Sequence, residues 1–319
     1  MTPSLGLAMC TYNGARYLDE QLKSIAAQTR KPDSLLVVDD CSSDRTTEIV
    51  RDFARQARFP VQLVVNHANL GFVQNFAKAI SLCAGDVIVL ADQDDVWRPQ
   101  KLERLEHAFQ RTELDACFSD AEVVDEQLRP LRLRLFEACG FGRDEQRRAL
   151  DGEAFEVLVR HNVVSGGTLA FRCQQKELVL PIPSVWAHDA WVALLIAAVG
   201  CVSVLEAPLI QRRQHGANSS GRVKRSLLYR LTVALRNQRG VVNDQLHLFA
   251  QASERLQRWG GIAPERMHLL NEKIRHLSSR AQLPHARWAR FGPVFSELRS
   301  SRYRRFSNGV YSAMRDVVV

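Results

Sequence analysis

Short apolar runs alternate with amphipathic stretches along the first part of the chain. The apolar runs occupy residues 5–10, 34–38, 61–65, 87–91 and 116–119. The stretches between them, for example residues 44–57 and 72–83, carry apolar side chains at the spacing of a helix with one buried face. Strands that alternate with helices pair into a parallel or mostly parallel sheet with helices on both faces. We therefore predict an α/β fold built on such a sheet.

The chain changes character after residue 221. Residues 222–319 hold 19 Lys and Arg against 6 Asp and Glu, a net charge of +13, whereas residues 1–221 have a net charge of −5. Apolar residues between 227 and 277 recur at helical spacing, with arginines on the polar faces. Because the two parts differ in charge and in pattern, we expect two domains. These are an α/β domain of residues 1–221 and a basic α-helical region of residues 222–319.

Cysteine usage and hydropathy indicate where such a chain works. The seven cysteines are scattered and never spaced as Cys-x-x-Cys, which favours reduced thiols in a cytosol over disulfides or a zinc site. The N-terminus has no basic stretch followed by an apolar one, so we expect no signal peptide. The longest apolar run, residues 191–205, is shorter than the roughly 20 residues that a membrane span requires. We expect a cytoplasmic protein in which this run forms a buried helix followed by a strand.

Three carboxylates follow the apolar run 87–91 directly. They belong to Asp92, Asp94 and Asp95. Carboxylates this close repel one another, and a cation commonly shares their space. Open α/β sheets also bind ligands at the carboxyl ends of their strands. The alternative is a solvated acidic turn that caps the next helix.

Polar residues also follow the first two predicted strands. Thr11, Tyr12 and Asn13 follow the first strand, and Asp39 and Asp40 end the second. In a parallel sheet these residues and the acidic cluster line one crevice. An aromatic ring, carboxylates that accept from base or ribose groups, and metal-binding acids together indicate a site for a nucleotide diphosphate.

The order of these motifs resembles a known family. The segments Thr-Tyr-Asn-Gly at 11–14, Val-Val-Asp-Asp-Cys-Ser-Ser-Asp at 37–44, Asn-Leu-Gly-Phe at 69–72 and Asp-Gln-Asp-Asp-Val-Trp at 92–97 resemble the inverting nucleotide-sugar glycosyltransferases of family 2, which have the GT-A fold. The last segment, with His-Asp-Ala-Trp at 188–191 and Arg-Gln-His-Gly at 213–216, is similar to the rhamnosyltransferase-like branch. The resemblance covers about the first 220 residues and places the nucleotide-sugar-binding and catalytic domain at residues 1–221.

The resemblance implies roles for the residues that bind the donor. The ring of Tyr12, flanked by Thr11 and Asn13, would stack on the base, and Asp39 or Asp40 would accept a hydrogen bond from it. Asp92 would hold the ribose.

The same resemblance implies a metal. Asp94 would bind Mg²⁺ or Mn²⁺, hard ions suited to carboxylate and phosphate oxygens, and Asp92 and His215 are further candidate ligands.

The resemblance also places a catalytic base at the start of the helix after residue 187, where the family commonly has Glu-Asp and this chain has His188 and Asp189. We take Asp189 as the base. By unperturbed pKa values His188 is better matched to proton abstraction at neutral pH, unless burial raises the pKa of Asp189. Gly166 and Gly167 allow the backbone to approach a sugar or acceptor closely, and a plain tight turn is the alternative.

The predicted function is metal-dependent transfer of a sugar, with inversion, onto a glycan or lipid-linked acceptor in cell-surface polysaccharide biosynthesis. The rhamnosyltransferase-like branch implies L-rhamnose from dTDP-rhamnose as donor. Alternatives are a UDP-hexose transferase of the same fold, a nucleotidyltransferase and a non-catalytic nucleic-acid binder. Residues 10–17 lack the Gly-rich, basic loop that a nucleotidyltransferase needs, and the basic region lacks nucleic-acid-binding signatures, so we expect no nucleic-acid partner.

Aromatic residues lie among the arginines of the basic region. They are Trp288, Phe291, Phe295, Tyr303 and Phe306. Basic and aromatic side chains together favour an anionic membrane surface, so we expect peripheral attachment at the inner face of the membrane. The alternative is that the arginines are solvated and the aromatic rings pack inside the protein.

Overall fold

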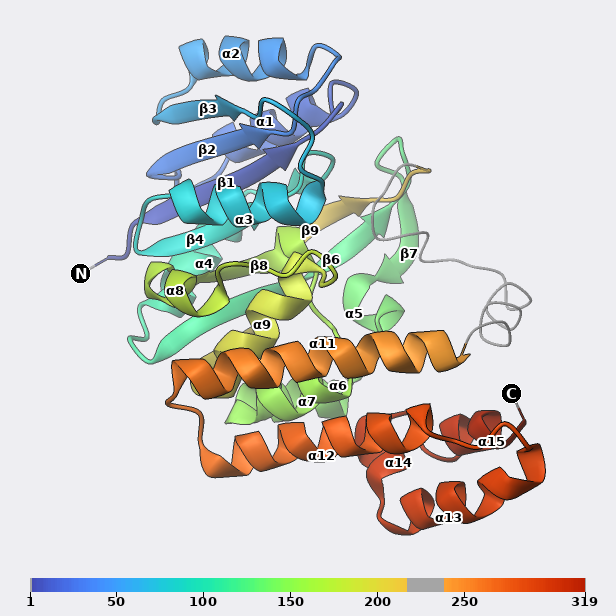
Figure 1. The fold of residues 1–319 in the computed structure, drawn as a ribbon. Coiled ribbons are helices and arrows are strands. Elements are labelled where there is room, and N and C mark those ends of the chain that lie inside the picture. Colours follow the sequence, from blue (N-terminus) through green and yellow to red (C-terminus); the bar gives the residue numbers. More distant parts are fainter. Residues whose placement is uncertain (1, 217–237, 319) are drawn as a thin grey trace. The chain divides into compact units, whose positions relative to one another are not determined.

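The computed structural model describes residues 2–216 and 238–318 (Figure 1). The chain divides into two compact units, which we call the sheet unit (Met1–Ala154 and Val163–Gly221) and the helical unit (Phe155–Asn162 and Arg222–Val319). The predicted division placed residues 155–162 with the sheet, whereas the structure assigns them to the helical unit. Phe155, Val157 and Val159 of this segment are buried.

One mixed sheet of nine strands forms the sheet unit. Four strands are parallel to their neighbours, in the order β3 (Val61–Val65), β2 (Ser34–Asp39), β1 (Leu5–Thr11), β4 (Val87–Ala91). The sheet continues with β8 (Leu169–Arg172), β6 (Leu114–Val124), β9 (Cys201–Arg213) and β5 (Val96–Trp97), while β7 (Pro130–Arg134) pairs with β6. Strand β8 runs antiparallel to both β4 and β6, and β9 runs parallel to β6.

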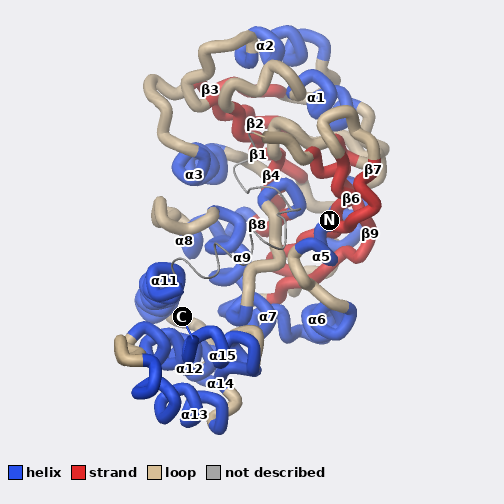
Figure 2. The backbone as a smooth tube through the Cα atoms, turned by 90° about the vertical axis from the view of Figure 1, so that its right-hand side faces the viewer, coloured by secondary structure: helices blue, strands red, loops and turns tan. Residues whose placement is uncertain are grey.

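Helices cover both faces of this sheet (Figure 2). One face carries α1 (Leu18–Ala26) and α2 (Thr46–Gln56), and the other carries α3 (Phe72–Leu82), α8 (Lys176–Val179) and α9 (His188–Val199). Helix α4 (Lys101–Phe109) shares one core cluster with α1 and α2. The short helices α5 (Leu135–Ala138) and α6 (Arg143–Arg148) follow β7. Strands β1 and β4 are buried along their whole length, as expected for strands covered on both sides.

The long apolar run of the sequence forms α9 and the start of β9. Helix α9 is buried almost all round, which explains why its sequence is apolar on every face. None of the described helices is long and apolar enough to cross a membrane.

The register of the sheet brings the strand ends level with one another. Thr11 of β1 pairs with Asp39 of β2, and Met9 pairs with Ala91 of β4. The polar residues that follow β1, β2 and β4 therefore meet at one edge, as the sequence predicted.

The helical unit contains α7 (Ala154–Arg160), α11 (Gln238–Trp259), α12 (Pro264–Ala281), α13 (Phe291–Arg299), α14 (Arg302–Phe306) and α15 (Val310–Val318). Helices α11 and α12 pack against each other. The buried ammonium of Lys273 donates to the carbonyl groups of Phe306, at 2.9 Å, and Arg160, at 3.3 Å. Burial lowers the pKa of Lys273 to about 7.

A second buried polar cluster joins α12 to α13, α14 and α15. The Arg280 guanidinium pairs with Asp316 at 2.6 Å, and the Tyr303 hydroxyl donates to the same carboxylate at 2.5 Å. Tyr303 is 1% exposed and Phe306 is 2% exposed. These two aromatic residues belong to the interior, in contrast to the surface position that the sequence suggested.

Candidate active site

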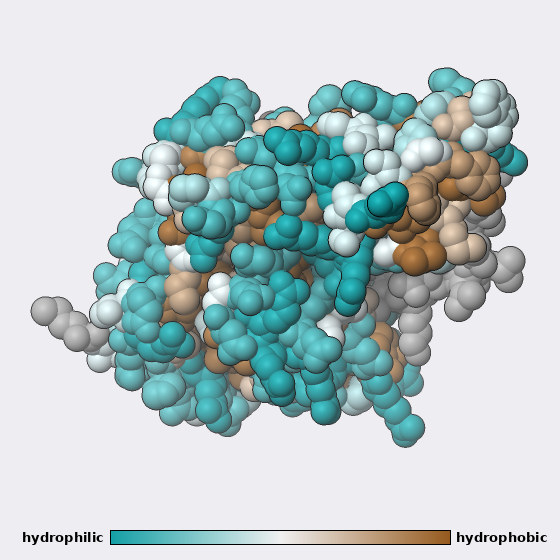
Figure 3. Space-filling view, turned by 90° about the horizontal axis from the view of Figure 1, so that it is seen from below, coloured by the Kyte–Doolittle hydropathy of each residue, from teal (hydrophilic) through white to brown (hydrophobic). Residues whose placement is uncertain are grey.

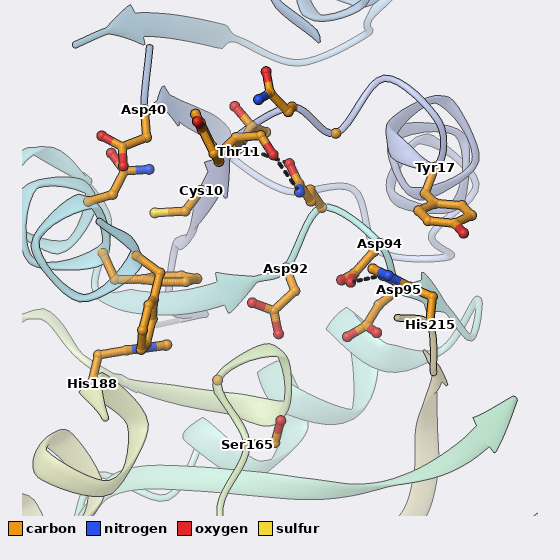
Figure 4. A pocket seen from close by; sticks show the side chains of 18 of the residues that line it. Cys10, Thr11, Tyr17, Asp40, Asp92, Asp94, Asp95, Ser165, His188 and His215 are labelled. Carbon is orange, nitrogen blue, oxygen red and sulfur yellow. Dashed lines mark hydrogen bonds and ion pairs between the residues drawn. The ribbon is translucent and has the colours of Figure 1, made fainter. Parts of the chain in front are cut away.

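A cavity of about 870 Å³ lies at the carboxyl edge of the parallel strands, inside the sheet unit. Its wall combines residues from the ends of β1, β2, β4 and β9, from α3 and from the start of α9 (Figure 4). Of the residues predicted to form the site, it is lined by Thr11, Tyr12, Asn13, Asp40, Asp92, Asp94, Gly166, His188, Asp189 and His215. Asp39 and Gly167 do not line it.

The two acids at the end of β2 have different positions. Asp39 is fully buried and accepts from the Thr11 hydroxyl at 2.8 Å and from the backbone N–H of Ser42 at 2.9 Å. Asp40 faces the cavity, and its carboxylate accepts from the backbone N–H groups of Leu70, at 2.8 Å, and Gly71, at 2.9 Å. Asp39 therefore fixes the end of β2 behind the cavity wall. Asp40 borders the cavity but is only 2% exposed, and its carboxylate also accepts from the Asn66 amide at 2.8 Å.

The ends of β1 and β4 are tied together by a side chain that the sequence did not single out. The Gln93 amide accepts from the Tyr12 N–H at 2.9 Å and donates to the Tyr12 carbonyl at 3.0 Å. Gly14 permits this contact, because a Cβ there would lie 2.1 Å from Gln93 Oε1. The Tyr12 ring remains 49% exposed at the cavity. Asn13 has a φ of 45° and accepts from the Ser43 N–H at 2.9 Å.

The acidic cluster after β4 crowds three carboxylates into one place (Figure 4). Burial, with the negative charge of Asp94 as a further cause, raises the pKa of Asp92. Burial also raises the pKa of Asp95 well above its usual range, and the charges of Asp94 and Asp92 add to the rise. Asp92 accepts from the backbone N–H of Gly167 at 3.1 Å. The three carboxylates are thus largely buried and repel one another, as expected of carboxylates arranged for a cation.

The predicted metal ligands are only partly brought together. Asp94 Oδ2 and His215 Nε2 lie 2.7 Å apart, and both side chains are largely buried (Figure 4). Among residues 2–216 and 238–318, no three His, Cys, Asp or Glu side chains are arranged to hold an ion by themselves, so Asp92 does not complete a set with the other two. A carboxylate and an imidazole fit a divalent cation whose remaining ligands come from a bound diphosphate.

An aromatic and basic layer supports His215. The Tyr17 ring lies 4.9 Å from the His215 ring, and the Arg213 guanidinium lies 4.5 Å from the centre of the same tyrosine ring. Arg213 is buried and also donates to the Asp94 carbonyl at 3.0 Å. Arg213 lies in the motif at residues 213–216, but its role could not be predicted from the sequence, because a cation–π contact leaves no local pattern.

A buried lysine lies behind the acidic cluster. The Lys101 ammonium donates to the Gly167 carbonyl at 2.7 Å and lies 3.5 Å from the centre of the Trp97 ring. Burial lowers the pKa of Lys101 well below its usual range, while Asp95 and Asp92 oppose that change. The sequence did not reveal this residue, because a lysine in an amphipathic helix ordinarily faces solvent.

Burial shifts the pKa values of the two base candidates in opposite directions. Desolvation raises the pKa of Asp189 to about 6, although the backbone N–H groups of Ala190 and Gly166 oppose the rise. Desolvation lowers the pKa of His188 to about 4. Asp189 is therefore the more basic of the two at the start of α9.

The His188 ring is held by aromatic contact alone. It stacks on Phe76 at 3.9 Å between ring centres, and Phe72 meets it edge-on at 6.2 Å. Neither of its ring nitrogens has a hydrogen-bond partner, although His188 is only 6% exposed. His188 and Asp189 both line the cavity, and Nε2 of the histidine lies next to Gly166.

The two glycines before β8 allow close approach by the protein's own side chains. A Cβ at Gly166 would lie 2.5 Å from His188 Nε2, and one at Gly167 would lie 2.7 Å from Asp95 Oδ2 and 3.0 Å from Asp92 Oδ2. The sequence suggested that these glycines let the backbone approach a ligand. In the structure they leave room for the side chains of His188 and of the acidic cluster.

Comparison with known proteins identifies the family of this site. Residues 7–170, just over half of the chain, match the family model "Glycosyl transferase family 2". The chain belongs to this family. An uncharacterized glycosyltransferase of Nostoc sp. PCC 7120 is 28% identical over 224 residues, which are 67% of this chain and 66% of the relative. The match thus spans slightly less than two thirds of that relative's own length.

Two solved structures share the fold. S. aureus TarS residues 1–349 in complex with UDP-GlcNAc align with a TM-score of 0.61 and 16% identity, over 98% of this chain and 88% of the other. The mannosyltransferase PcManGT from Pyrobaculum calidifontis, in complex with GDP-Man and Mn²⁺, aligns with a TM-score of 0.56 and 17% identity, over 100% of this chain and 87% of the other. The predicted GT-A fold is confirmed, and the chain is a glycosyltransferase of family 2.

Proposed function

We propose that this glycosyltransferase is metal-dependent and inverting, and that it moves L-rhamnose from dTDP-rhamnose onto a glycan or lipid-linked acceptor in cell-surface polysaccharide biosynthesis. The reaction would take place in the cytoplasm, at the inner face of the membrane. The observation that carries the catalytic part is the cavity itself, in which an exposed aromatic ring, an acidic cluster and a carboxylate of raised pKa face one space. The complexes of TarS with UDP-GlcNAc and of PcManGT with GDP-Man support a nucleotide-sugar donor.

In this proposal the donor nucleotide binds along the ends of β1 and β2. The Tyr12 ring stacks on the base, with Thr11 and Asn13 shaping the loop beneath it, and Asp40 accepts from the base. Asp92 holds the ribose. Asp39 acts indirectly, because its carboxylate already accepts from Thr11 and Ser42.

Asp94 and His215 would hold a divalent cation, Mg²⁺ or Mn²⁺, together with the donor diphosphate. The contact between their side chains at 2.7 Å supports this pairing, and the Mn²⁺ in the PcManGT structure is consistent with it. When bound, the cation would neutralise the charge that develops on the departing diphosphate.

The chemical step is a single displacement. The acceptor hydroxyl oxygen bonds to the anomeric carbon on one face while the bond between that carbon and the diphosphate oxygen breaks on the other, which inverts the configuration. Asp189 accepts the hydroxyl proton, and the nucleoside diphosphate leaves. A pKa of about 6 suits this role, because the carboxylate is ionised at neutral pH yet more basic than an ordinary aspartate. His188 stays neutral and offers its ring nitrogens to sugar hydroxyl groups.

A donor screen tests the substrate. Purified protein with Mn²⁺ would be given dTDP-rhamnose, UDP-glucose, UDP-galactose, UDP-N-acetylglucosamine and GDP-mannose, and release of nucleoside diphosphate would be followed. We expect dTDP-rhamnose to be hydrolysed fastest. A clear preference for a UDP-hexose, the alternative that the TarS complex favours, would refute the rhamnose donor and leave the transferase mechanism standing.

A further inference from the structure

The C-terminal part of the helical unit hides its negative charges and exposes its positive ones. Between residues 285 and 318 the carboxylates belong to Glu297 and Asp316, and both are buried. Glu297 pairs with His276 at 2.9 Å, and Asp316 pairs with Arg280 at 2.6 Å. The charged side chains classed as exposed in this segment are all arginines: Arg287, Arg299, Arg304 and Arg305. The exposed charges that this segment itself contributes are therefore all positive, and one of them, Arg305, pairs with Glu272 of α12 at 3.0 Å.

The helix that starts this segment also exposes large aromatic rings. Trp288 is 80% exposed, Phe291 is 62% exposed and Phe295 is 61% exposed. Their spacing places them on one side of the continuous helical stretch formed by the turn Arg287–Arg290 and α13, and Arg299 falls on the same side. Val294 and Glu297, which lie outside this stripe, are buried. Helix α13 thus has one face packed inward and one face of aromatic rings without cover in the described structure.

Helix α15 repeats this pattern. Val310, Tyr311, Met314 and Val318 are more than half exposed, while Ala313 is buried in the same small core. Helix α15 packs against both α13 and the turn before it, so the two apolar stripes lie on adjoining helices. Figure 3 shows apolar residues gathered at the right-hand end of the lower face of the molecule, next to hydrophilic ones. We call α13, α14, α15 and the turn Arg287–Arg290 the arginine–aromatic surface.

A patch of large exposed apolar residues marks an interaction site. A second copy of this chain would bring like charges together at such a surface, which opposes self-association. In a phospholipid bilayer with anionic headgroups, the negative charges attract arginine side chains, and tryptophan and phenylalanine rings insert into the interface. Because residues 285–318 expose no carboxylate, this segment has no exposed negative charge that the anionic headgroups would repel.

We propose that the arginine–aromatic surface binds anionic phospholipid bilayers and holds the enzyme at the membrane. The surface belongs to the helical unit alone. This inference names the residues behind the membrane location in the proposed function, and it does not depend on the donor and acceptor chemistry. Attachment would keep the enzyme in the plane in which lipid-linked acceptors diffuse.

Sedimentation of the full-length protein with vesicles tests the proposal. Vesicles of phosphatidylcholine alone are compared with vesicles of equal parts phosphatidylcholine and phosphatidylglycerol. We expect binding to the mixed vesicles at low salt and release at about 1 M salt, where screening shortens the reach of exposed charges to about 3 Å. Equal binding to both kinds of vesicle, or binding to neither, would overturn the proposal.

Two matched pairs of variants locate the binding surface. Changing Arg287, Arg299 and Arg304 together to Gln should lower the partition coefficient on the order of 100-fold, since each basic side chain near an anionic surface contributes about fivefold. Changing Arg51, Arg55 and Arg58 to Gln removes the same charge from exposed positions in and just after α2 and should have little effect. Equal losses from the two sets would contradict the assignment.

The second pair separates the aromatic contribution from charge. Trp288→Ser should weaken binding at least several-fold, whereas Trp259→Ser, at the exposed end of α11, should not. Light scattering shows whether the protein is monomeric; a dimer that Trp288→Ser dissociates would assign the surface to a second copy and refute the membrane role. Donor hydrolysis without vesicles should be unchanged in these variants, so a failure of the membrane proposal is distinguishable from a failure of the proposed chemistry.

Discussion

His188 and Asp189 are adjacent residues whose chemistry diverges because both are buried. A buried carboxylate loses hydration in its charged form, so its pKa rises, whereas a buried imidazole loses hydration as a cation, so its pKa falls. The result is an aspartate with a pKa of about 6 next to a histidine with a pKa of about 4. At neutral pH both are unprotonated, and the aspartate holds a proton more strongly.

Replacement of Asp189 by Asn tests its assignment as the general base. Loss of a positioned base typically lowers kcat by about 10²- to 10⁴-fold, and donor affinity should be retained. The measurement is steady-state transfer together with donor titration. His188→Gln should lose less rate, and an equal loss would mean that the two residues act as a unit or that His188 is the base.

The pH dependence provides an independent check. Activity should fall as pH falls through about 6, because protonated Asp189 cannot accept the acceptor proton; a fall centred near 4 would instead indicate His188. The raised pKa also destabilises the folded protein above the unfolded pKa of an aspartate, by up to about 3 kcal/mol at pH 8. Asp189→Asn should therefore stabilise the protein against denaturant at pH 8, with the gain vanishing as pH falls below about 4. A variant that is inactive and also less stable at pH 8 would point to a structural role.

Asp94→Asn tests the metal pairing with His215. We expect loss of Mn²⁺-dependent donor binding and of nearly all transfer, because an amide oxygen carries no charge to bind the cation. Calorimetric titration of donor with and without Mn²⁺ measures the effect, and Asp52→Asn, an exposed aspartate in α2, is the matched control. Normal turnover of the wild-type protein in EDTA would contradict the metal site.

At the scale of elements, the short helical turn before β8 connects the two halves of the cavity. Its residues Gly166 and Gly167 lie against His188 on one side and against the acidic cluster on the other. The turn therefore sets the distance between the base candidates and the acidic cluster.

Gly167→Ala should disturb this space. The added methyl group would meet the carboxylates of Asp95 and Asp92, and overpacking of a buried site costs about 1–3 kcal/mol. We expect lower stability and a raised KM for the donor. Gly142→Ala is the control, because nothing lies within 4 Å of a Cβ there and its φ is −74°. Wild-type stability and donor KM in Gly167→Ala would show that the acids can move without consequence.

The strand–helix alternation was enough to predict the elements that carry the nucleotide end of the site. The parallel direction of β1, β2 and β4 follows from apolar runs joined by amphipathic helices. This is why Tyr12, Asp40 and Asp94 were predicted to lie in one crevice, and all three line the cavity. The direction of β8 was not predictable, because an apolar run of four residues is compatible with either direction. Lys101 and Gln93 were missed because their roles depend on partners distant in the sequence, at Gly167 and Tyr12.

At the scale of the whole molecule, the helical unit depends on buried ion pairs as well as on apolar packing. Arg280, Tyr303 and Asp316 share one buried cluster, so removal of any partner leaves a polar group without its bond. The same burial of carboxylates leaves only positive charges exposed among residues 285–318.

Tyr303→Phe tests the contribution of this cluster. The variant keeps the ring and loses the hydroxyl that donates to Asp316, so the free energy of unfolding should fall by about 1–3 kcal/mol. Tyr311→Phe changes an exposed ring and should stay within about 0.5 kcal/mol of the wild type. Denaturant unfolding measures both variants, and a Tyr303→Phe protein as stable as the Tyr311→Phe protein would show that the bond to Asp316 contributes nothing.

The assignment of residues 155–162 to the helical unit matters for how the chain is made. A ribosome synthesises α7 long before α11 and α12. The apolar side chains of α7, among them Phe155, Val157 and Leu158, therefore stay exposed until the rest of their unit has been synthesised. A nascent chain halted near residue 221 would carry this helix without its unit and would be a substrate for chaperones or prone to aggregate. Gene fusions and shortened coding sequences should for the same reason keep α7 together with residues 222–319.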